Sequence, residues 1–293
     1  MAIVRVVTVF EQTGFDPRLE WGVEGARVLA AACRVVVVVD VLSFTTAIEV
    51  AVGRGAVVFP HRWPDPGAAA FARRVGAVLA GRRDEPRSTG EPPRGSPDPS
   101  GSTGEPPRGS PDPSGPGGRP PYSLSPVSLL DVPPGTRLVL PSPNGSAVAA
   151  AIAHAGPVVL AGCLRNASAV ARAAREAGGD GPVGVVAAGE RRPDGALRPA
   201  VEDLLGAGAV LHALGGRPSP EARAAVAAFR QRDLPRDLLA SASGRELAAL
   251  GRTAEVHLAA EHDVSQVVPV LRDGAFTRLD RRPADPGQLR WPG

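Results

Sequence analysis

An unbroken run of five valines at 35–39 constrains the fold more than any other stretch of the sequence. β-Branched residues without a polar interruption are typical of a strand buried on both faces, as the strands of parallel sheets are. Further strands are expected at 56–60, 137–140, 158–161 and 183–188, and helices at 44–54, 65–81, 146–154, 168–177 and 202–214. This alternation predicts an α/β fold, a three-layer α/β/α sandwich with a mostly parallel sheet.

The two ends of the chain add other elements. Residues 1–10 are expected to form a strand that contains Arg5, and no small-residue cleavage site follows, which argues against a signal peptide. After Pro218 the pattern turns mainly helical, and the dipeptide Asp273-Gly274 is typical of a β-hairpin. A helical C-terminal segment that ends in a hairpin is therefore expected to follow the sandwich.

Many of the glycines and prolines fall in one segment. The chain has 35 Gly and 32 Pro, and the sequence STGEPPRGSPDPSG occurs twice in succession, at 88–101 and 102–115. The repeat has no Val, Ile, Leu or aromatic residue, so it cannot offset its ordering entropy by burying apolar surface. We expect 84–121 to be a disordered Pro/Gly-rich tandem-repeat insertion within a single domain that spans 1–293. A Pro-rich ligand for a protein partner is the alternative interpretation.

Composition excludes several classes of protein. No uncharged apolar run approaches the roughly 18–20 residues that a membrane span needs. Two cysteines, Cys33 and Cys163, are too few for a disulfide framework or a Cys-rich zinc site. The net charge is +3, but all 33 basic residues are scattered arginines and only 4% of residues are aromatic, which argues against nucleic-acid binding. We expect a reduced, cytoplasmic protein without a membrane or nucleic-acid partner; homo-oligomerisation stays open.

Polar residues follow four of the expected strands at their carboxyl ends, where ligands bind in such sheets. The candidate site residues are Asp40, Ser43, Thr45 and Thr46 after the first strand, Asn144, Gly145 and Ser146 after the 137–140 strand, Arg165 and Asn166 after the 158–161 strand, Glu190 and Arg191 after the 183–188 strand, and Glu202 and Asp203 in the first turn of the next helix. All of them are expected at one edge of the sheet.

This set of side chains predicts an anion site beside a hard cation. Helix N-termini with Ser, Thr or Asn offer free backbone N–H groups to phosphate. The carboxylates are oxygen ligands of the kind that Mg²⁺ takes together with water. Arg165 and Arg191 can each place two N–H donors on a phosphate, carboxylate or sulfonate group.

Each candidate also has a structural interpretation when it is taken alone. Asp40 can cap the helix that follows it, and Asn144-Gly145 is an ordinary turn dipeptide. Glu202 and Asp203 lie where acidic residues interact favourably with a helix dipole, and Asn166 can be an N-cap. The functional interpretation rests on their combination at one sheet edge.

Other phosphate and hydrolase motifs are absent. A G-x-x-x-x-G-K-[ST] loop cannot occur because the chain has no Lys, and there is no G-x-S-x-G. Leu42 stands where a haloacid dehalogenase has a second Asp, two residues after Asp40. Ala169 stands where a cysteine phosphatase has Arg, six residues after Cys163, so Cys163 is interpreted as a small buried residue. The five histidines show no zinc spacing.

Six short motifs occur in an order that resembles the 2-phosphosulfolactate phosphatase family. They are VVVVDVLSFTTAIEVAVGRGA at 36–56, PNGS at 143–146, LRNASAVA at 164–171, VEDLLGAGA at 201–209, SGREL at 243–247 and VVPVLRDGAF at 267–276. The resemblance covers nearly the whole chain apart from 84–121. A stretch at 122–126 resembles the short N-S-P-like segment of the family.

The resemblance implies a Mg²⁺-dependent phosphatase associated with coenzyme M biosynthesis. Asp40, Asn144, Gly145, Ser146, Asn166, Glu202 and Asp203 fall on motif positions that would line the site. From side-chain chemistry we expect Asp40, Glu202 and Asp203 to hold the metal. One departure is clear: Ser43-Phe44 replaces the Arg-Ala that the family commonly has, which removes a bidentate anion contact.

The sequence therefore favours a phosphatase that hydrolyses a small anionic 2-phospho acid, nominally 2-phospho-3-sulfolactate, to 3-sulfolactate and phosphate. Asp40, Glu202 and Asp203 are the expected catalytic residues, and whether water or Asp40 attacks phosphorus stays open. The alternative hypothesis is a non-catalytic binder or sensor of a phosphorylated or carboxylated metabolite on the same fold.

Overall fold

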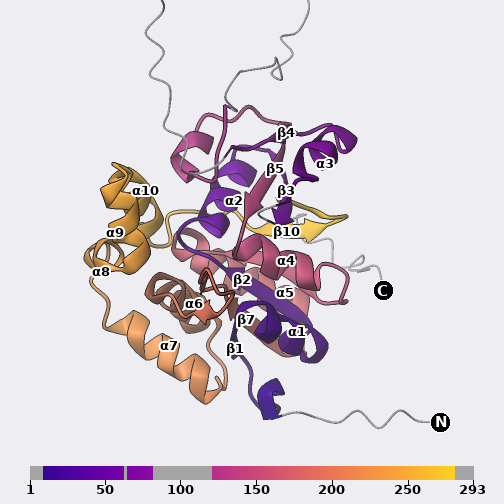
Figure 1. Ribbon diagram of the computed structural model, residues 1–293. Helices are drawn as coiled ribbons and strands as arrows, with labels where there is room; N and C mark the ends of the chain where they lie inside the picture. The colour runs from indigo at the N-terminus through magenta and orange to yellow at the C-terminus, as the bar shows by residue number, and fades with distance from the viewer. Residues whose placement is uncertain (1–8, 63–64, 82–120, 281–293) are drawn as a thin grey trace, which may run out of the picture.

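The computed structural model describes residues 9–62, 65–81 and 121–280. These residues form one large sheet with helices on both faces, which confirms the predicted three-layer α/β/α sandwich (Figure 1). The sheet has nine strands among the described residues, in the order β1-β7-β2-β6-β10-β11-β3-β5-β4. A separate two-stranded hairpin, β8–β9, lies outside it.

The strands of the large sheet are β1 (Arg18–Trp21), β2 (Val35–Val39), β3 (Val57–Arg62), β4 (Val78–Leu79), β5 (Arg137–Ser142), β6 (Val158–Gly162), β7 (Val183–Ala187), β10 (Pro269–Arg272) and β11 (Ala275–Arg278). The small hairpin comprises β8 (Glu190–Arg191) and β9 (Leu197–Arg198). The helices are α1 (Gly22–Ala32), α2 (Phe44–Gly53), α3 (Ala68–Arg74), α4 (Gly145–Ile152), α5 (Ala167–Gly178), α6 (Val201–Leu214), α7 (Pro220–Arg230), α8 (Arg236–Ala240), α9 (Ala242–Ala249) and α10 (Thr253–Ala260), with 3-10 turns at η1 (Val9–Glu11), η2 (Pro126–Leu129) and η3 (Leu164–Asn166).

The sheet consists of two parallel halves joined by the C-terminal hairpin. Strands β1, β7, β2 and β6 are parallel to one another, and so are β3, β5 and β4. The hairpin β10–β11 lies between the halves and makes three successive antiparallel pairings, with β6, within itself and with β3. Three reversals leave the second half running opposite to the first. Figure 1 shows the halves above and below β10.

Packing explains why the valine run at β2 is uninterrupted. Val35, Val37 and Val39 pack with α5, α6 and α7 in one core, whereas Val36 and Val38 pack with α1 and α4 in another. All five valines are fully buried because helices cover both faces of the strand. The other half of the sheet repeats this arrangement, with α2 and η2 on one face and α3 on the other.

The C-terminal region confirms the expected helices and hairpin. Helices α7 to α10 follow Pro218, and Asp273 and Gly274 have φ angles of 49° and 79° at the turn between β10 and β11. Both positive values suit the turn type that an Asp-Gly dipeptide favours. The position of this hairpin, in the middle of the sheet, was not predicted from the sequence.

Two expected elements are wrong. The helix expected at 65–81 ends at Arg74, and β4 follows at Val78–Leu79, where it pairs with β5. Gly76, with a φ of 61°, makes the turn between them, a conformation that glycine adopts without strain. Val9 and Phe10, the end of the expected N-terminal strand, lie in a 3-10 turn. Residues 1–8, and 84–120 of the expected insertion, lie outside the described residues.

One pair of elements was not expected from the sequence, β1 and α1 at Arg18–Ala32. Strand β1 forms the edge of the sheet beside β7, and α1 covers the same half of the sheet. In the described part of the chain, no helix has the length and apolar character required to cross a membrane.

Candidate active site

Three acidic side chains come together where the carboxyl ends of the two half-sheets meet. Asp40 follows β2, and Glu202 and Asp203 lie in the first turn of α6. All three are at least 95% buried, with exposed fractions of 5%, 2% and 3%. We call this set the acidic cluster. The sequence predicted its members, and the structure brings them together.

Asp40 ties the two half-sheets to each other. Its Oδ2 accepts a hydrogen bond of 2.8 Å from the backbone N–H of Gly145, which follows β5, and its Oδ1 accepts one of 3.2 Å from Phe44 N. Strand β5 runs opposite to β2, so the expectation that all the candidate strands end at one edge of a parallel sheet is wrong. The residues still meet, because the carboxyl ends of the two halves face each other.

Asp203 fixes the loops that follow β2 and β7. Its Oδ1 accepts a hydrogen bond of 2.7 Å from Val41 N, and its Oδ2 accepts one of 2.8 Å from Gly189 N. Burial raises the pKa of this carboxyl well above its ordinary value, and the charges of Asp40 and Glu202 raise it further. The backbone N–H groups act in the opposite direction without cancelling the rise.

Glu202 differs from Asp40 and Asp203 in its hydrogen bonding. Its Oε2 is buried and has no hydrogen-bond partner within the described part of the chain. A buried carboxylate oxygen without a partner is costly, and each such atom in a native structure calls for an explanation, such as a bound ion or a catalytic role. Because the charges of Asp40 and Glu202 also act on Asp203, the cluster is a candidate cation site.

Gly145 allows the two half-sheets to approach this closely. A Cβ at this position would lie 2.6 Å from Asp40 Oδ2 and would also overlap the ring of Phe44. Any other residue would therefore displace Asp40 or the start of α2. This is the physical reason for glycine after Asn144, and it goes beyond the turn dipeptide that the sequence alone indicates.

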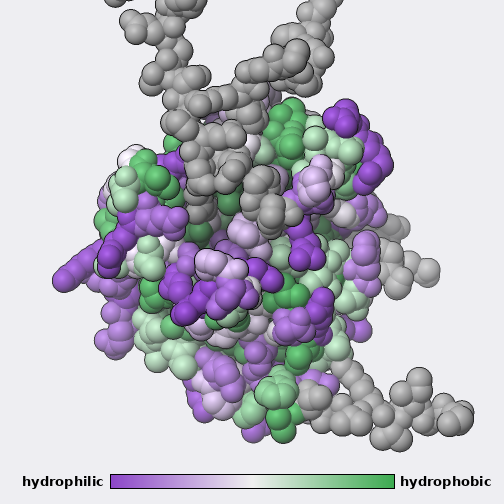
Figure 2. Space-filling model, viewed as in Figure 1, coloured by the Kyte–Doolittle hydropathy of each residue, from purple (hydrophilic) through white to green (hydrophobic). Residues whose placement is uncertain are grey.

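The β8–β9 hairpin borders the acidic cluster. Glu190 Oε2 accepts hydrogen bonds of 2.9 and 2.5 Å from Arg198 Nε and Nη2, and Glu190 Oε1 accepts one of 2.5 Å from Ser243 Oγ in α9. Asn144 Oδ1 accepts a bond of 3.1 Å from Arg191 N. Figure 2 shows a hydrophilic patch in the middle of this face, over the region where Figure 1 draws α6.

Several predicted anion-binding side chains shape the loops instead. Thr45 Oγ1 donates to Asp40 O and accepts from Asp40 N, and Thr46 Oγ1 donates to Val41 O. Ser146 Oγ donates to His61 O and to Ser142 O, which joins the ends of β3 and β5. Thr45, Thr46 and Ser146 are fully buried. Ser43 is buried beside them at the N-terminus of α2. Direct contact of these hydroxyls with phosphate stays a prediction.

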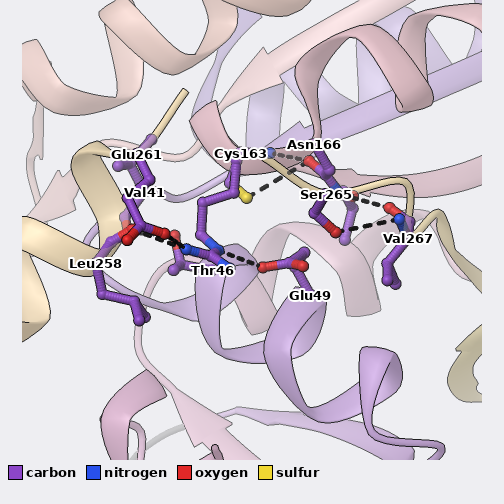
Figure 3. A network of polar contacts seen from close by, with 11 residues as sticks. Val41, Thr46, Glu49, Cys163, Asn166, Leu258, Glu261, Ser265 and Val267 are labelled. Atoms are coloured by element: carbon purple, nitrogen blue, oxygen red, sulfur yellow. Dashed lines mark hydrogen bonds and ion pairs between the residues drawn. The ribbon is translucent and has the colours of Figure 1, made fainter. Parts of the chain in front are cut away.

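Arg165 and Asn166 lie in a second polar network, and Figure 3 labels Asn166 and three partners of Arg165, which are Glu49, Leu258 and Glu261. Arg165 Nε donates to Glu49 Oε2 over 2.7 Å, and its Nη1 donates to Glu261 Oε2 and to Leu258 O. We call Arg165, Glu49 and Glu261 the paired network. Its two carboxylates neutralise the guanidinium, so the structure favours a structural role for Arg165. Its predicted contact with substrate stays a prediction.

Asn166 closes the turn after β6. Its Oδ1 accepts from Cys163 N over 2.8 Å, and its Nδ2 donates to Val267 O and Ala161 O. Cys163 is fully buried, as predicted, and burial raises the pKa of its thiol to about 12. A thiol with this pKa is protonated at neutral pH and is a poor nucleophile.

The fit of a metal ion can be judged from the cluster itself. Among the described residues, no group of three or more His, Cys, Asp or Glu side chains stands in an arrangement that could hold a metal ion. Mg²⁺ is usually bound by only one or two carboxylates, with water and substrate phosphate as the other ligands. The unpartnered Glu202 Oε2 and the mutual repulsion of three buried carboxylates fit a cation of this kind.

Sequence reasoning missed two groups at the site. Arg198 and Ser243 complete the contacts of Glu190, but neither follows a strand of the large sheet. Ser243 carries a signal in retrospect, because it opens the motif SGREL. Arg198 lies three residues before the start of the motif VEDLLGAGA, and only the pairing of β8 with β9 places it opposite Glu190.

A family model identifies the protein family to which the chain belongs. The family model described as 2-phosphosulpholactate phosphatase matches residues 121–274, just over half of the chain. The chain therefore belongs to this family. The match includes every predicted site residue except those of the 40–46 loop.

Two curated relatives agree with this assignment. The "2-phosphosulfolactate phosphatase" of Methanothermobacter thermautotrophicus is 36% identical over 147 residues, which are 50% of this chain and 61% of the relative. The "Probable 2-phosphosulfolactate phosphatase" of Thermus thermophilus is 36% identical over 143 residues, 47% of this chain and 58% of the relative. The matched region thus spans about three fifths of the length of each relative.

Proposed function

We propose that the protein is a Mg²⁺-dependent phosphatase that hydrolyses 2-phospho-3-sulfolactate, a small acid, to 3-sulfolactate and phosphate. The observation that carries the proposal is the acidic cluster, which buries three carboxylates and leaves Glu202 Oε2 without a hydrogen-bond partner among the residues that the structure describes. The family membership and the names of the two relatives support the reaction and the substrate.

Glu202, together with either Asp40 or Asp203, would hold the metal ion. When bound, Mg²⁺ would polarise the phosphoryl group and favour deprotonation of an attacking water. Asp40 and Asp203 each accept two backbone N–H groups, so their oxygens are fixed before any ligand arrives. Such preorganisation avoids reorientation during the reaction, which is a major source of rate enhancement.

The N-termini of α2 and α4 lie on either side of Asp40, and we infer that they attract the phosphoryl group. Helix α2 begins at Phe44 and α4 at Gly145, and each of these residues donates its N–H to the Asp40 carboxylate. Both helix dipoles therefore place partial positive charge beside the carboxylates. This arrangement offsets part of the repulsion between the cluster and an anionic substrate.

A phosphate-release assay with 2-phospho-3-sulfolactate tests the proposal. Wild type should release phosphate in a Mg²⁺-dependent way that EDTA abolishes, and Asp40→Asn should reduce kcat by about 10²–10³-fold. Glu261→Gln, in the paired network, is the matched control and should retain activity. If wild type binds phospho acids but releases phosphate from none of them, the protein is a binder and the phosphatase proposal fails.

A further inference from the structure

The β8–β9 hairpin is held at three points, one of which is in the acidic cluster. Gly189 N, just before β8, donates to Asp203, and Arg191 N donates to Asn144. Glu190 between them accepts from Ser243 of α9. The base of the hairpin is therefore fixed to elements from both halves of the sheet and from the C-terminal helices, although residues 191–197 at its tip are exposed.

Glu190 uses its carboxylate to orient Arg198. One oxygen accepts from Ser243, and the other accepts both Nε and Nη2 of Arg198, so each oxygen already has a partner. Because the Arg198 guanidinium already compensates its charge, Glu190 is a poorer metal ligand than Glu202. Its hydrogen bonds to the guanidinium raise the pKa of Arg198, and the negative charges of Glu202 and Asp203 raise it further, so the side chain stays cationic.

Arg198 differs from Arg165 in how many N–H donors of its guanidinium group are already hydrogen-bonded. Arg165 is 13% exposed and is paired with two carboxylates and a carbonyl. Arg198 is 28% exposed and pairs only with Glu190, through Nε and Nη2. Its Nη1 makes no hydrogen bond within the described ranges. A guanidinium held rigidly along one edge presents its other N–H groups in a fixed direction.

We propose that Arg198 binds an acid group of the substrate that is not transferred, the carboxylate or the sulfonate, and that Glu190 and Ser243 position it. This inference rests on the proposed function. In the 40–46 loop, Ser43 stands where the family commonly has an Arg. Arg198 would supply the positive charge that this Arg provides. The substrate class is thus one that carries a second anionic group beside its phosphate.

Charge balance is the reason that such a residue is needed. A phosphorylated sulfo acid brings a phosphate and two further acid groups toward three buried carboxylates. Mg²⁺ and the helix N-termini can compensate the phosphate, but they do not discriminate among phosphate monoesters. A guanidinium is suited to this discrimination because it binds carboxylate and sulfonate oxygens with two parallel hydrogen bonds.

Calorimetric titration of the full chain in the presence of Mg²⁺ tests the proposal without turnover. The probes are 3-sulfolactate, lactate and inorganic phosphate, and the proteins are wild type, Arg198→Ala and the control Arg192→Ala, which lies on the same hairpin and is exposed. Arg198→Ala should weaken 3-sulfolactate binding by about 10–100-fold, the usual range for a charge-assisted pair, and should leave phosphate binding within about twofold. Weaker lactate binding as well would assign the contact to the carboxylate, and unchanged lactate binding would assign it to the sulfonate.

The role of Ser243 has a separate readout. Ser243→Ala should raise KM for 2-phospho-3-sulfolactate while kcat stays within about twofold, and the effect should disappear in the Arg198→Ala background because both changes act on one contact. An additive effect would contradict a positioning role.

The Arg198 proposal is overturned if Arg198→Ala leaves 3-sulfolactate binding unchanged, if it weakens all three probes equally, or if wild type does not bind 3-sulfolactate. A protein that binds 3-sulfolactate through Arg198 but releases no phosphate would overturn the proposed function and leave this assignment intact.

Discussion

The paired network and the acidic cluster both contain buried carboxylates, but Glu49 of the paired network has an ion-pair partner, whereas Glu202 of the cluster has an oxygen without a hydrogen-bond partner in the described part of the chain. In the paired network, Glu49 and Glu261 share the guanidinium of Arg165. In the acidic cluster, Glu202 Oε2 has no hydrogen-bond partner among residues 9–62, 65–81 and 121–280, and the charges of Asp40 and Glu202 add to the effect of burial in raising the pKa of Asp203. Leaving a buried carboxylate oxygen such as Glu202 Oε2 without a partner among the described residues is costly, so the cluster is the stronger candidate for a functional site.

Removing one negative charge from the acidic cluster should lower activity but raise stability. Glu202→Gln keeps the shape of the side chain but removes the charge of a carboxylate that has no partner at Oε2. We expect activity to fall by about 10²–10³-fold while the metal-free protein gains about 1–2 kcal/mol. Phosphate release and urea unfolding measure the two effects. A loss of both activity and stability would mean that the cluster is structural.

The paired network should respond in the opposite way. Arg165→Met removes the cation and leaves Glu49, whose side chain is 4% exposed, buried without its ion-pair partner. We expect a loss of about 3–5 kcal/mol in the free energy of unfolding, the usual range for breaking a buried pair. The properly folded fraction should retain its KM at low temperature. A raised KM with unchanged stability would instead show that Arg165 binds substrate, as the sequence predicts.

Gly145 tests the junction between the two half-sheets. Gly145→Ala places a methyl group 2.6 Å from Asp40 Oδ2, so the neighbours must move at a typical cost of about 1–3 kcal/mol. Activity should fall with stability because Asp40 is displaced. Gly178→Ala is the matched control, since its Cβ would meet Val183 and Val35 at 3.6 Å, an ordinary contact. Equal behaviour of the two variants would contradict the close approach.

The smallest expected effect is a pH dependence of stability in the metal-free protein. Because burial and the neighbouring carboxylates raise the pKa of Asp203, the folded state binds this proton more tightly than the unfolded state does. The stabilising contribution is therefore present below the ordinary Asp pKa of about 3.9 and is lost as pH rises toward the raised value. Urea titrations across this range should show a shallower loss in Glu202→Gln, which removes one of the causes.

The sequence predicted the fold class and the members of the acidic cluster, but not how they meet. Val35–Val39 and the alternating elements carry local signals that do not depend on the rest of the chain. The direction of β5 relative to β2 depends on β10–β11, which pairs across more than 100 residues with β6 and β3. Such long-range pairing leaves no periodic trace in a single sequence.

The roles of individual polar residues were harder to predict than their positions. Arg165 and Arg198 are chemically identical, and their difference lies only in their partners, Glu49 and Glu261 for one and Glu190 for the other. Thr45 and Ser146 likewise stand where phosphate ligands are expected, yet their hydroxyls bind the backbone. Partner choice is set by tertiary packing.

Calorimetric titration of Mg²⁺ into the metal-free protein tests most directly the proposal that the acidic cluster binds a metal ion. Glu49→Gln, in the paired network, is the control for a change in buried charge elsewhere. We predict that wild type and Glu49→Gln bind Mg²⁺ with the same Kd and that Glu202→Gln binds it at least about tenfold more weakly. Equal Mg²⁺ binding by wild type and Glu202→Gln would contradict the account.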